Sequence, residues 1–262
     1  MSFVYLILGI IFLLIVFNLK SKKAPTTSAI EEKKEIMLPD FATRDETTGN
    51  VSLSFTFEDS LYKEGHYLVF DIETSGLPKS KGIHPEFSEN FPRVLQVAWK
   101  LFDEYGDIIS SDDRYLKQTA KIPASATLIN GIDDAKIKEL GEDHSVVFSD
   151  FIDDIKNCKV VVCHNAEFDI PIMESEFLRN GFKKQFSKKK KICTMKLGTN
   201  ICCLDKDYGR GYKYPKLEEL FKYLFFRDAV YFKMDGLHNA SLDVSVTAKC
   251  LFELKGLGYI KY

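Results

Sequence analysis

Hydrophobic and polar residues alternate or cluster along the chain in ways that predict a mixed set of strands and helices. Residues 67–72 form a short apolar run typical of a buried strand, and 94–102 and 108–116 predict two more, joined by a turn at 103–107. Residues 159–163 add a Val-rich strand. Helical patterns follow or intervene at 123–130, 145–156, 166–180, 217–225 and 241–254. Three strands in succession, followed by alternating helices and strands, favour a mixed α/β sheet with helices on both faces.

The N-terminal segment has a different pattern. Phe3 to Phe17 is apolar apart from one Gly, and Lys20, Lys22 and Lys23 follow it. As a helix, residues 1–19 would span about 28 Å, close to the hydrocarbon thickness of a bilayer. A cleaved signal peptide and a buried core helix are the alternatives. The basic residues follow the apolar run and no A-x-A pattern is present, which favours a retained anchor over a signal peptide.

The positive charges after the apolar run also predict its orientation. By the positive-inside rule they place the following domain on the cytoplasmic side of a single-pass membrane protein. The six cysteines form no CxxC pair and suggest free, mostly buried thiols in a reducing compartment. The lipid bilayer is therefore one expected partner, through residues 1–20.

Composition and patterning divide the chain into four parts. We expect an anchor at 1–20, a polar linker at 21–65, a catalytic domain at 66–256 and a tail at 257–262. Residues 51–57 alternate in polarity and predict an edge strand within the linker. The formal net charge of −2 conceals an acidic linker and a domain whose acidic and basic residues balance.

Three short clusters carry the candidate chemistry. Asp71 and Glu73 lie two apart on a predicted buried strand, so their side chains share one face. Asp169 falls in the first turns of a helix that follows the Val-rich strand, and His238 precedes Asp243 by five residues at another helix start. Carboxylates are the ligands that Mg²⁺ and Mn²⁺ prefer, and His is suited to accept a proton near neutral pH.

Each cluster alone has an ordinary explanation. An acidic pair at a strand end can face solvent, Asp169 can stabilise a helix N-terminus, and a loop His is often merely solvated. An interior strand makes unpaired carboxylates costly, which speaks against the first explanation. Taken together, the four carboxylates and one imidazole predict a site for two divalent cations that cleaves phosphodiester bonds.

The three clusters resemble the motifs of the DEDDh 3′–5′ exonucleases, the family of the bacterial polymerase III proofreading subunit, ribonuclease T and oligoribonuclease. Asp71–Leu77 matches its Asp-x-Glu-Thr-x-Gly-Leu, His164–Asp169 its His-Asn-Ala-x-Phe-Asp, and His238–Asp243 its His-x-Ala-x-x-Asp. The resemblance covers residues 67–254. It implies an RNase H-like mixed five-stranded sheet with helices on both faces, preceded here by one transmembrane helix.

The resemblance also implies roles for individual residues. Asp71, Glu73 and Asp243 would hold one Mg²⁺ or Mn²⁺, with Asp71 bridging to a second near Asp169, and His238 would deprotonate the attacking water. The positions expected to touch the terminal nucleotide are Thr74, Gly76, Leu77, Phe168 and Asn130; Asn130 stands where the family often has His. Products would be nucleoside 5′-monophosphates released from free 3′ ends of single-stranded or frayed nucleic acid.

Several alternatives remain open on the sequence alone. A catalytically silent nucleic-acid-binding module would share the fold, and a polymerase-associated proofreading subunit would share the activity. DNA and RNA are not distinguished, because contacts to the 2′-hydroxyl are not legible. The stretch 179–191 holds seven basic residues and no acid, typical of a solvated loop or of a phosphate-binding patch.

Overall fold

The computed structural model describes residues 42–44, 51–53, 64–227, 232–234 and 236–261 of the chain, all within one compact unit that comprises residues 37–262. Residues 1–20, where the sequence predicts a transmembrane helix, lie outside the described residues. Within the described part of the chain, no helix combines the length and the apolar character needed to cross a membrane.

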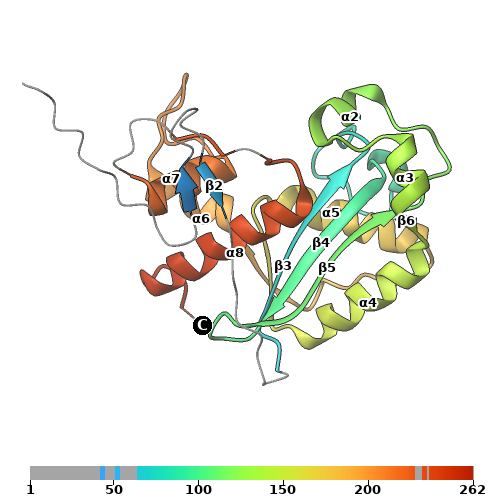
Figure 1. Ribbon diagram of the computed structural model, residues 1–262, viewed down its shortest axis with the longest axis horizontal. Helices are drawn as coiled ribbons and strands as arrows, with labels where there is room; N and C mark the ends of the chain where they lie inside the picture. The colour runs from blue at the N-terminus through green and yellow to red at the C-terminus, as the bar shows by residue number, and fades with distance from the viewer. Residues whose placement is uncertain (1–41, 45–50, 54–63, 228–231, 235, 262) are drawn as a thin grey trace, which may run out of the picture. The chain divides into compact units, whose positions relative to one another are not determined.

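The main sheet has the strand order β6-β5-β4-β3-β7-β8 (Figure 1). Its members are β3 (Tyr67–Thr74), β4 (Val94–Phe102), β5 (Ile108–Leu116), β6 (Gly141–Glu142), β7 (Val160–Cys163) and β8 (Lys190–Cys193). Strands β3, β4 and β5 pair antiparallel, whereas β7 and β8 extend the sheet in parallel beyond β3. The family resemblance predicted five strands. The sixth is β6, a two-residue edge strand that pairs in parallel with the end of β5.

Helices cover both faces of the sheet, as predicted. They are α2 (Ala124–Asn130), α3 (Asp134–Leu140), α4 (His144–Asn157), α5 (Ala166–Arg179), α6 (Thr194–Cys202), α7 (Leu217–Phe225) and α8 (Ala240–Gly256). Figure 1 shows α8 on one side of the sheet and α4 and α5 on the other. A 3₁₀ turn at Ser88–Asn90 precedes β4.

The core explains this arrangement, because the two faces of β3 pack against different helices. Leu68, Phe70 and Ile72 belong to a buried cluster with aromatic residues of α4 and α5. Phe70 stacks on Phe186 and meets Phe151 of α4 edge-on, with ring centroids 5.2 and 5.5 Å apart. Aromatic pairs of this kind add to the free energy gained by burying their area. They hold α4 and α5 against this face of the sheet.

The predicted edge strand at 51–57 is seen in part. Residues Val51–Leu53 form β2, which pairs antiparallel with β1 (Ala42–Arg44) in a separate two-stranded sheet. The rest of that predicted strand lies outside the described residues. All six cysteines are free thiols, as expected; Cys203 is the exposed one.

Candidate active site

Strand β3 presents Asp71 and Glu73 toward α8. Because side chains alternate along a strand, these two carboxylates share the face opposite Phe70 and Ile72. Helix α8 packs on that face: Phe252 meets Tyr67 edge-on at a centroid distance of 5.8 Å. The pairing register sets Asp71 opposite Ala98 and Glu73 opposite Gln96, in the centre of the sheet. The central position explains why both acids are largely screened from water.

The start of α8 brings Asp243 and His238 to the same place. Asn239 caps the helix, since its side chain accepts a hydrogen bond from the backbone N–H of Leu242 at 3.3 Å. The backbone N–H of His238 donates to Asp243 Oδ2 at 3.3 Å. His238 has φ of 68°, a left-handed conformation that is uncommon outside glycine. This turn therefore fixes the imidazole beside the carboxylate five residues later.

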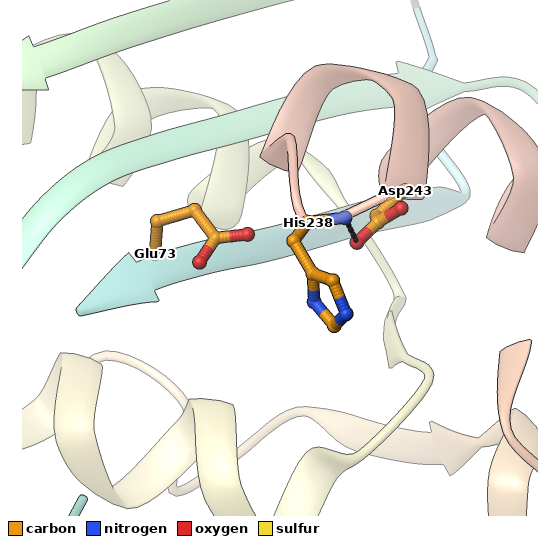
Figure 2. Close-up of side chains that lie close together, drawn as sticks. All are labelled: Glu73, His238 and Asp243. Atoms are coloured by element: carbon orange, nitrogen blue, oxygen red, sulfur yellow. Dashed lines mark hydrogen bonds between the residues drawn. The ribbon is translucent and has the colours of Figure 1, made fainter. Parts of the chain in front are cut away.

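Glu73, His238 and Asp243 form a tight group of candidate ligands. One side-chain ligand atom from each lies within 4.8 Å of the other two. Figure 2 shows the imidazole extending from the turn before α8 into the space beside Glu73 and Asp243. Glu73 is buried and His238 is exposed, so the group opens to solvent on the histidine side.

Asp169 joins the site from α5, in the first turn of that helix, where its backbone N–H bonds to the Asn165 carbonyl at 3.1 Å. Its side chain is 3% exposed. Burial raises the pKa of Asp169 well above its usual range, and the charges of Glu73 and Asp243 raise it further. The sequence placed Asp169 correctly at a helix start, and the structure turns it toward the other carboxylates.

The four carboxylates repel one another. Burial raises the pKa of Asp71 well above its ordinary value, and Asp169, Asp243 and Glu73 each add to that rise. Burial, and after it the charge of Asp243, raises the pKa of Glu73 to about 7. Burial likewise raises the pKa of Asp243 to about 7. Four acids whose charged forms all disfavour one another need a cation to be fully ionised at neutral pH.

The donor set fits such a cation. The buried atoms Asp169 Oδ2 and Asp243 Oδ1 have no hydrogen-bond partner among the residues that the structure describes. Buried polar atoms are normally paired, so two unpaired carboxylate oxygens at one site call for an explanation. Carboxylate oxygens are the ligands of hard divalent cations such as Mg²⁺ and Mn²⁺, and coordination would satisfy both atoms.

The predicted nucleotide-contacting residues lie around the end of β3. Thr74 is buried and its hydroxyl donates to the Gly76 carbonyl at 2.7 Å, while Leu77 is 79% exposed. Asn130, at the end of α2, donates from Nδ2 to the Thr74 carbonyl at 3.2 Å. Phe168 is half-buried and packs against the core under α5. Thr74, Gly76, Leu77 and Asn130 are thus neighbours, and Phe168 is part of the turn that carries Asp169.

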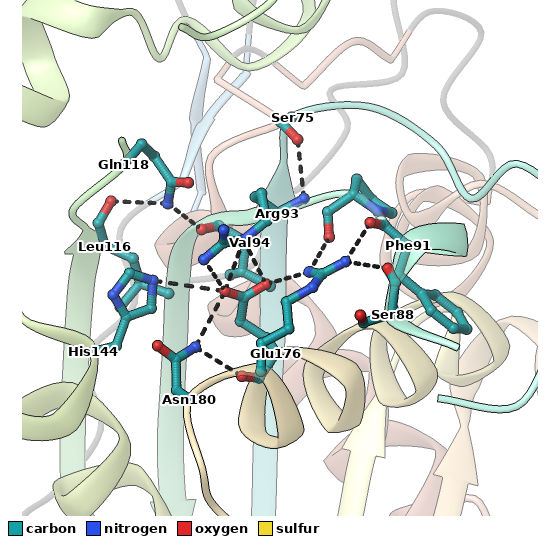
Figure 3. A network of polar contacts seen from close by, with 12 residues as sticks. Ser75, Ser88, Phe91, Arg93, Val94, Leu116, Gln118, His144, Glu176 and Asn180 are labelled. Carbon is teal, nitrogen blue, oxygen red and sulfur yellow. Dashed lines mark hydrogen bonds and ion pairs between the residues drawn. The ribbon is translucent and has the colours of Figure 1, made fainter. Parts of the chain in front are cut away.

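A buried ionic network behind the site was not predicted from the sequence. Glu176 lies on α5, seven residues after Asp169, and is fully buried. It accepts hydrogen bonds from Arg93 Nη2 and Arg179 Nη1, each at 2.7 Å (Figure 3). Arg179 also donates to the carbonyls of Pro92, Ser88 and Phe91, just before β4. The network ties α5 to the segment that leads into β4.

The same network reaches the end of β3. The Ser75 N–H donates to the Arg93 carbonyl at 2.9 Å, and the Ser75 hydroxyl accepts from the Arg93 N–H at 3.0 Å. Ser75 follows Glu73 by two residues. Glu176 and Arg93 are 83 residues apart in the sequence, and neither lies in a recognisable motif. The sequence alone therefore does not predict that they pair.

The basic stretch at 179–191 lies mostly away from the carboxylates. Lys184 and Lys188–Lys190 line a cavity of about 870 Å³ with His66, Lys156 and Lys159. This cavity lies where β3, β7 and β8 begin, because Tyr67, Val160 and Lys190 are register partners. Asp71 is four residues further along β3, about 13 Å at the rise of a strand. A phosphate-contacting role beside the catalytic helix is therefore not what the structure supports for these lysines.

An α/β domain with this sheet order and carboxylates on β3, α5 and α8 defines a nuclease of the RNase H-like class. Residues 68–251 match the family model RNase T, described as exonuclease, and the chain belongs to this family of DEDD-type 3′–5′ exonucleases.

Among curated proteins the chain resembles PolC-type DNA polymerase III from Streptococcus pyogenes serotype M2 and from Streptococcus sanguinis. Each is 26% identical over 204 residues, which is 77% of this chain and 12% of the relative. The chain thus corresponds to a small part of those polymerases.

Among solved structures, similar folds are those of E. coli exonuclease I. Its zinc-bound complex with single-stranded DNA has a TM-score of 0.57 and 18% identity, and covers 74% of this chain and 41% of that one. Its complex with a dT13 oligonucleotide has a TM-score of 0.56 and 19% identity, covering 72% and 40%. At this identity the likeness extends to the fold alone.

Proposed function

We propose that this protein hydrolyses single-stranded or frayed DNA from the 3′ end, one nucleotide at a time, with divalent cations as cofactors. The observation that carries the proposal is the convergence of four carboxylates and His238 at one place in a chain of the exonuclease family. The choice of DNA is supported by the PolC-type relatives and by exonuclease I, whose structures contain DNA oligonucleotides.

Asp71, Glu73 and Asp243 would hold one cation, and Asp71 with Asp169 a second, with Mg²⁺ or Mn²⁺ as the expected metals. Bound there, divalent cations would neutralise the charge that builds on the phosphate oxygens during displacement. The carboxylates would then be ionised and no longer repel one another. Asp243 is further held by the backbone N–H of His238.

His238 would accept the proton of the attacking water at an imidazole nitrogen. Its place supports this role, because the ring is exposed to solvent while its backbone is fixed by Asp243. Imidazole is the side chain best matched to proton transfer near neutral pH. The leaving group is the 3′ oxygen of the preceding nucleotide, and the product is a nucleoside 5′-monophosphate.

The residues after β3 would hold the terminal nucleotide. Leu77 is exposed on the segment that follows Thr74, where its side chain can pack against the last base. Asn130 is positioned beside the Thr74 carbonyl and can orient a polar group of the nucleotide. Phe168 packs against the core and would support this pocket from its buried side.

The decisive experiment uses 5′-labelled DNA and RNA strands with the purified protein. We expect a ladder of products shortening from the 3′ end in Mg²⁺ or Mn²⁺ and none with a chelator, with DNA degraded faster than RNA. Absence of metal-dependent shortening on either strand would reject the enzyme. The Asp71→Asn variant distinguishes an enzyme from a catalytically silent nucleic-acid-binding module. For the enzyme, the substitution should abolish hydrolysis while the protein still binds the strand.

We further propose that residues 1–20 anchor the protein in a membrane, with the nuclease domain on the cytoplasmic side. The proposal rests on the apolar run and on Lys20, Lys22 and Lys23 after it. Membrane fractionation and protease digestion of intact cells test it. The protein should sediment with membranes and resist external protease. Digestion of the domain by protease added outside the cells would show that the predicted cytoplasmic orientation is wrong.

Association with a polymerase is the second candidate role. It is favoured by the PolC-type relatives, in which the matching region is part of a DNA polymerase. Co-purification of the full chain with a replicative polymerase, and faster removal of mismatched than matched 3′ ends in its presence, would support it. Equal rates with and without the polymerase would leave the protein as a standalone exonuclease.

A further inference from the structure

A short hairpin between α6 and α7 has an unusual composition. Residues 206–216 read Lys-Asp-Tyr-Gly-Arg-Gly-Tyr-Lys-Tyr-Pro-Lys, with three tyrosines, four basic residues and one acid. Asp205 pairs with Tyr212 across the hairpin, and the Lys213 N–H donates to the Leu204 carbonyl at 2.9 Å. Gly209 and Gly211 have φ of 91° and 83°, which lets the chain reverse at the tip. The hairpin lies in the orange segment of Figure 1.

The tyrosines of this hairpin are exposed. Tyr208, Tyr212 and Tyr214 have exposed fractions of 92%, 43% and 57%. Single exposed aromatic residues are common, but three within seven residues, interleaved with Lys206, Arg210 and Lys213, form a concentrated surface. Aromatic faces beside cations are the usual means by which proteins hold single-stranded nucleic acid without regard to sequence.

The base of the hairpin is fixed to the active-site segment by His164. Its Nε2 lies 3.1 Å from the Pro215 carbonyl, and its Nδ1 lies 3.0 Å from the Thr194 hydroxyl. Burial lowers the pKa of His164 to about 4, so the ring is neutral at physiological pH. Because a carbonyl can only accept, Nε2 carries the proton and Nδ1 accepts from Thr194. His164 directly follows β7 and precedes Asp169 by five residues.

Two further contacts hold the hairpin close to the site. A side chain at Gly198 of α6 would meet the Pro215 ring at 3.1 Å, so glycine there permits the close approach of Pro215. Lys196 of α6 forms an ion pair with Glu167, which lies in the same helical turn as Asp169. Contacts thus lead from Pro215, at the base of the hairpin, through α6 to the turn that carries Asp169.

We propose that this hairpin binds the nucleic-acid strand upstream of its 3′ end, by stacking bases on Tyr208, Tyr212 and Tyr214 and by pairing phosphates with Lys206 and Arg210. The inference rests on the proposed function and adds where the rest of the strand is held. Stacking is insensitive to sequence because every base has an aromatic face. The hairpin would therefore favour long single strands over very short ones, whatever their sequence.

The first test measures binding of a fluorescent dT20 strand to the full chain carrying Asp71→Asn, which prevents turnover. Replacing the three tyrosines by Ala should weaken binding about 100-fold or more at fixed salt, since each of three stacked bases contributes about fivefold or more. Tyr105→Ala is the matched control, because Tyr105 is 80% exposed but lies in the turn between β4 and β5, where β3 begins. Unchanged affinity of the triple variant would overturn the inference.

The cations are tested separately by salt dependence. Lys206→Gln with Arg210→Gln should lower the slope of log K against log salt by about 1.4, since each contact to a single strand contributes about 0.7. A slope equal to that of the parent would remove these two residues from the interface. If the triple Ala variant fails to fold, triple Phe and triple Leu variants replace it: Phe should retain affinity and Leu should lose it, and equal affinities would overturn stacking.

A turnover experiment distinguishes this inference from the proposed function. In the otherwise wild-type chain, the ratio of kcat/KM on a 20-nucleotide strand to kcat/KM on a dinucleotide should fall in the triple Ala variant by about the same factor as the affinity for dT20. An unchanged ratio, with both substrates cleaved, would reject the hairpin but keep the exonuclease. Failure of the wild-type protein to cleave either substrate would reject the proposed function, and dT20 binding would still decide on the hairpin.

Discussion

Arg93 Nη2 lies 2.7 Å from Glu176 Oε1, and Glu176 has no solvent exposure although the Arg93 side chain is 37% exposed. The pair joins the residue just before β4 to the helix that carries Asp169. His144, at the start of α4, approaches the same carboxylate at 3.6 Å. A buried carboxylate paired with the two guanidinium groups of Arg93 and Arg179 is stable only while these partners remain, since an uncompensated buried charge is costly.

Replacing Arg93 with Met should therefore destabilise the protein strongly. We expect a loss of about 3 kcal/mol in the free energy of unfolding, because breaking a buried ion pair typically costs 3–5 kcal/mol and Arg179 still bonds to Glu176. Urea denaturation measures it. The control is Arg114→Met, whose partners Asp112, Glu142 and Asp150 are all partly exposed and for which we expect less than about 1 kcal/mol. Similar losses for the two variants would contradict the role assigned to burial.

The stability of the metal-free protein should depend on pH in an unusual direction. Glu73 and Asp243 have folded-state pKa values of about 7, above those of an unfolded chain, so the folded state binds more protons between about pH 4 and 7. Stability is then highest at low pH within this window and falls as pH rises through 7. Each unit of pKa shift corresponds to about 1.4 kcal/mol, so the fall should be on the order of a few kcal/mol.

Denaturation in chelator at pH 5.5 and pH 8 tests this, and Mn²⁺ provides the comparison. With Mn²⁺ the carboxylates should be ionised in the folded state, and stability should rise at pH 8 much more than at pH 5.5. Without metal, the double variant Glu73→Gln, Asp243→Asn should lose the part of the pH dependence that these two carboxylates contribute and keep the part that comes from Asp71 and Asp169. A metal-free protein equally stable at both pH values would show that the four carboxylates do not repel one another as described.

His238→Gln should lower kcat by about 100- to 10,000-fold with little change in stability, because a general base contributes that much and the exposed imidazole packs against little. Single-turnover hydrolysis of a labelled strand measures the chemical step. Binding of Mn²⁺ by calorimetry should stay within about tenfold if His238 transfers protons rather than holding the cation. His66→Gln is the control, since His66 lies just before β3, at the end of that strand away from Glu73.

If His238→Gln lowers kcat by less than tenfold, the imidazole does not act as the general base. A loss of Mn²⁺ binding of more than a hundredfold would instead make His238 a ligand, which the tight group with Glu73 and Asp243 permits.

Much of this fold follows from local sequence patterns, and the parts that do not follow share a physical reason. Strand β4 and helix α7 begin and end where the apolar pattern predicts, because each buries a regular face. Strand β8 was missed: it starts with two exposed lysines, and among the described strands it pairs with β7 alone, at the edge of the sheet. Helix α6 was also missed, because Gly198 in its middle weakens the helical pattern while allowing contact with Pro215.

The same distinction holds at the site. The carboxylates and His238 lie in compact motifs, so their types and spacing identified them before the structure brought them together. Glu176 acts through Arg93, and His164, although it begins a recognised motif, acts through Pro215; both partners are distant in sequence, and no local spacing reveals such pairs. Residues that hold a site in place are thus harder to predict than those that form it.

Asn130→Ala should raise KM more than it lowers kcat. Asn130 Nδ2 donates to the Thr74 carbonyl at 3.2 Å, its Oδ1 accepts from the Ile132 N–H at 3.0 Å, and its side chain also lowers the pKa of Glu73 in part. Losing a hydrogen bond of about 0.5–1.5 kcal/mol at the nucleotide pocket corresponds to about a 2- to 12-fold rise in KM. Steady-state kinetics on a labelled strand, with urea denaturation alongside, measures both effects.

Asn90→Ala is the matched control for that variant, because Asn90 also bonds to backbone through both ends of its amide, at Ser80, but in an exposed turn. Both variants should lose about 1 kcal/mol of stability or less, since each removes two hydrogen bonds that water can partly replace. Only Asn130→Ala should change KM, because Asn130 bonds to Thr74, the residue directly after Glu73, whereas Asn90 bonds to Ser80 in an exposed turn. If the two variants have equal KM values, Asn130 supports the end of α2 and takes no part in holding the nucleotide.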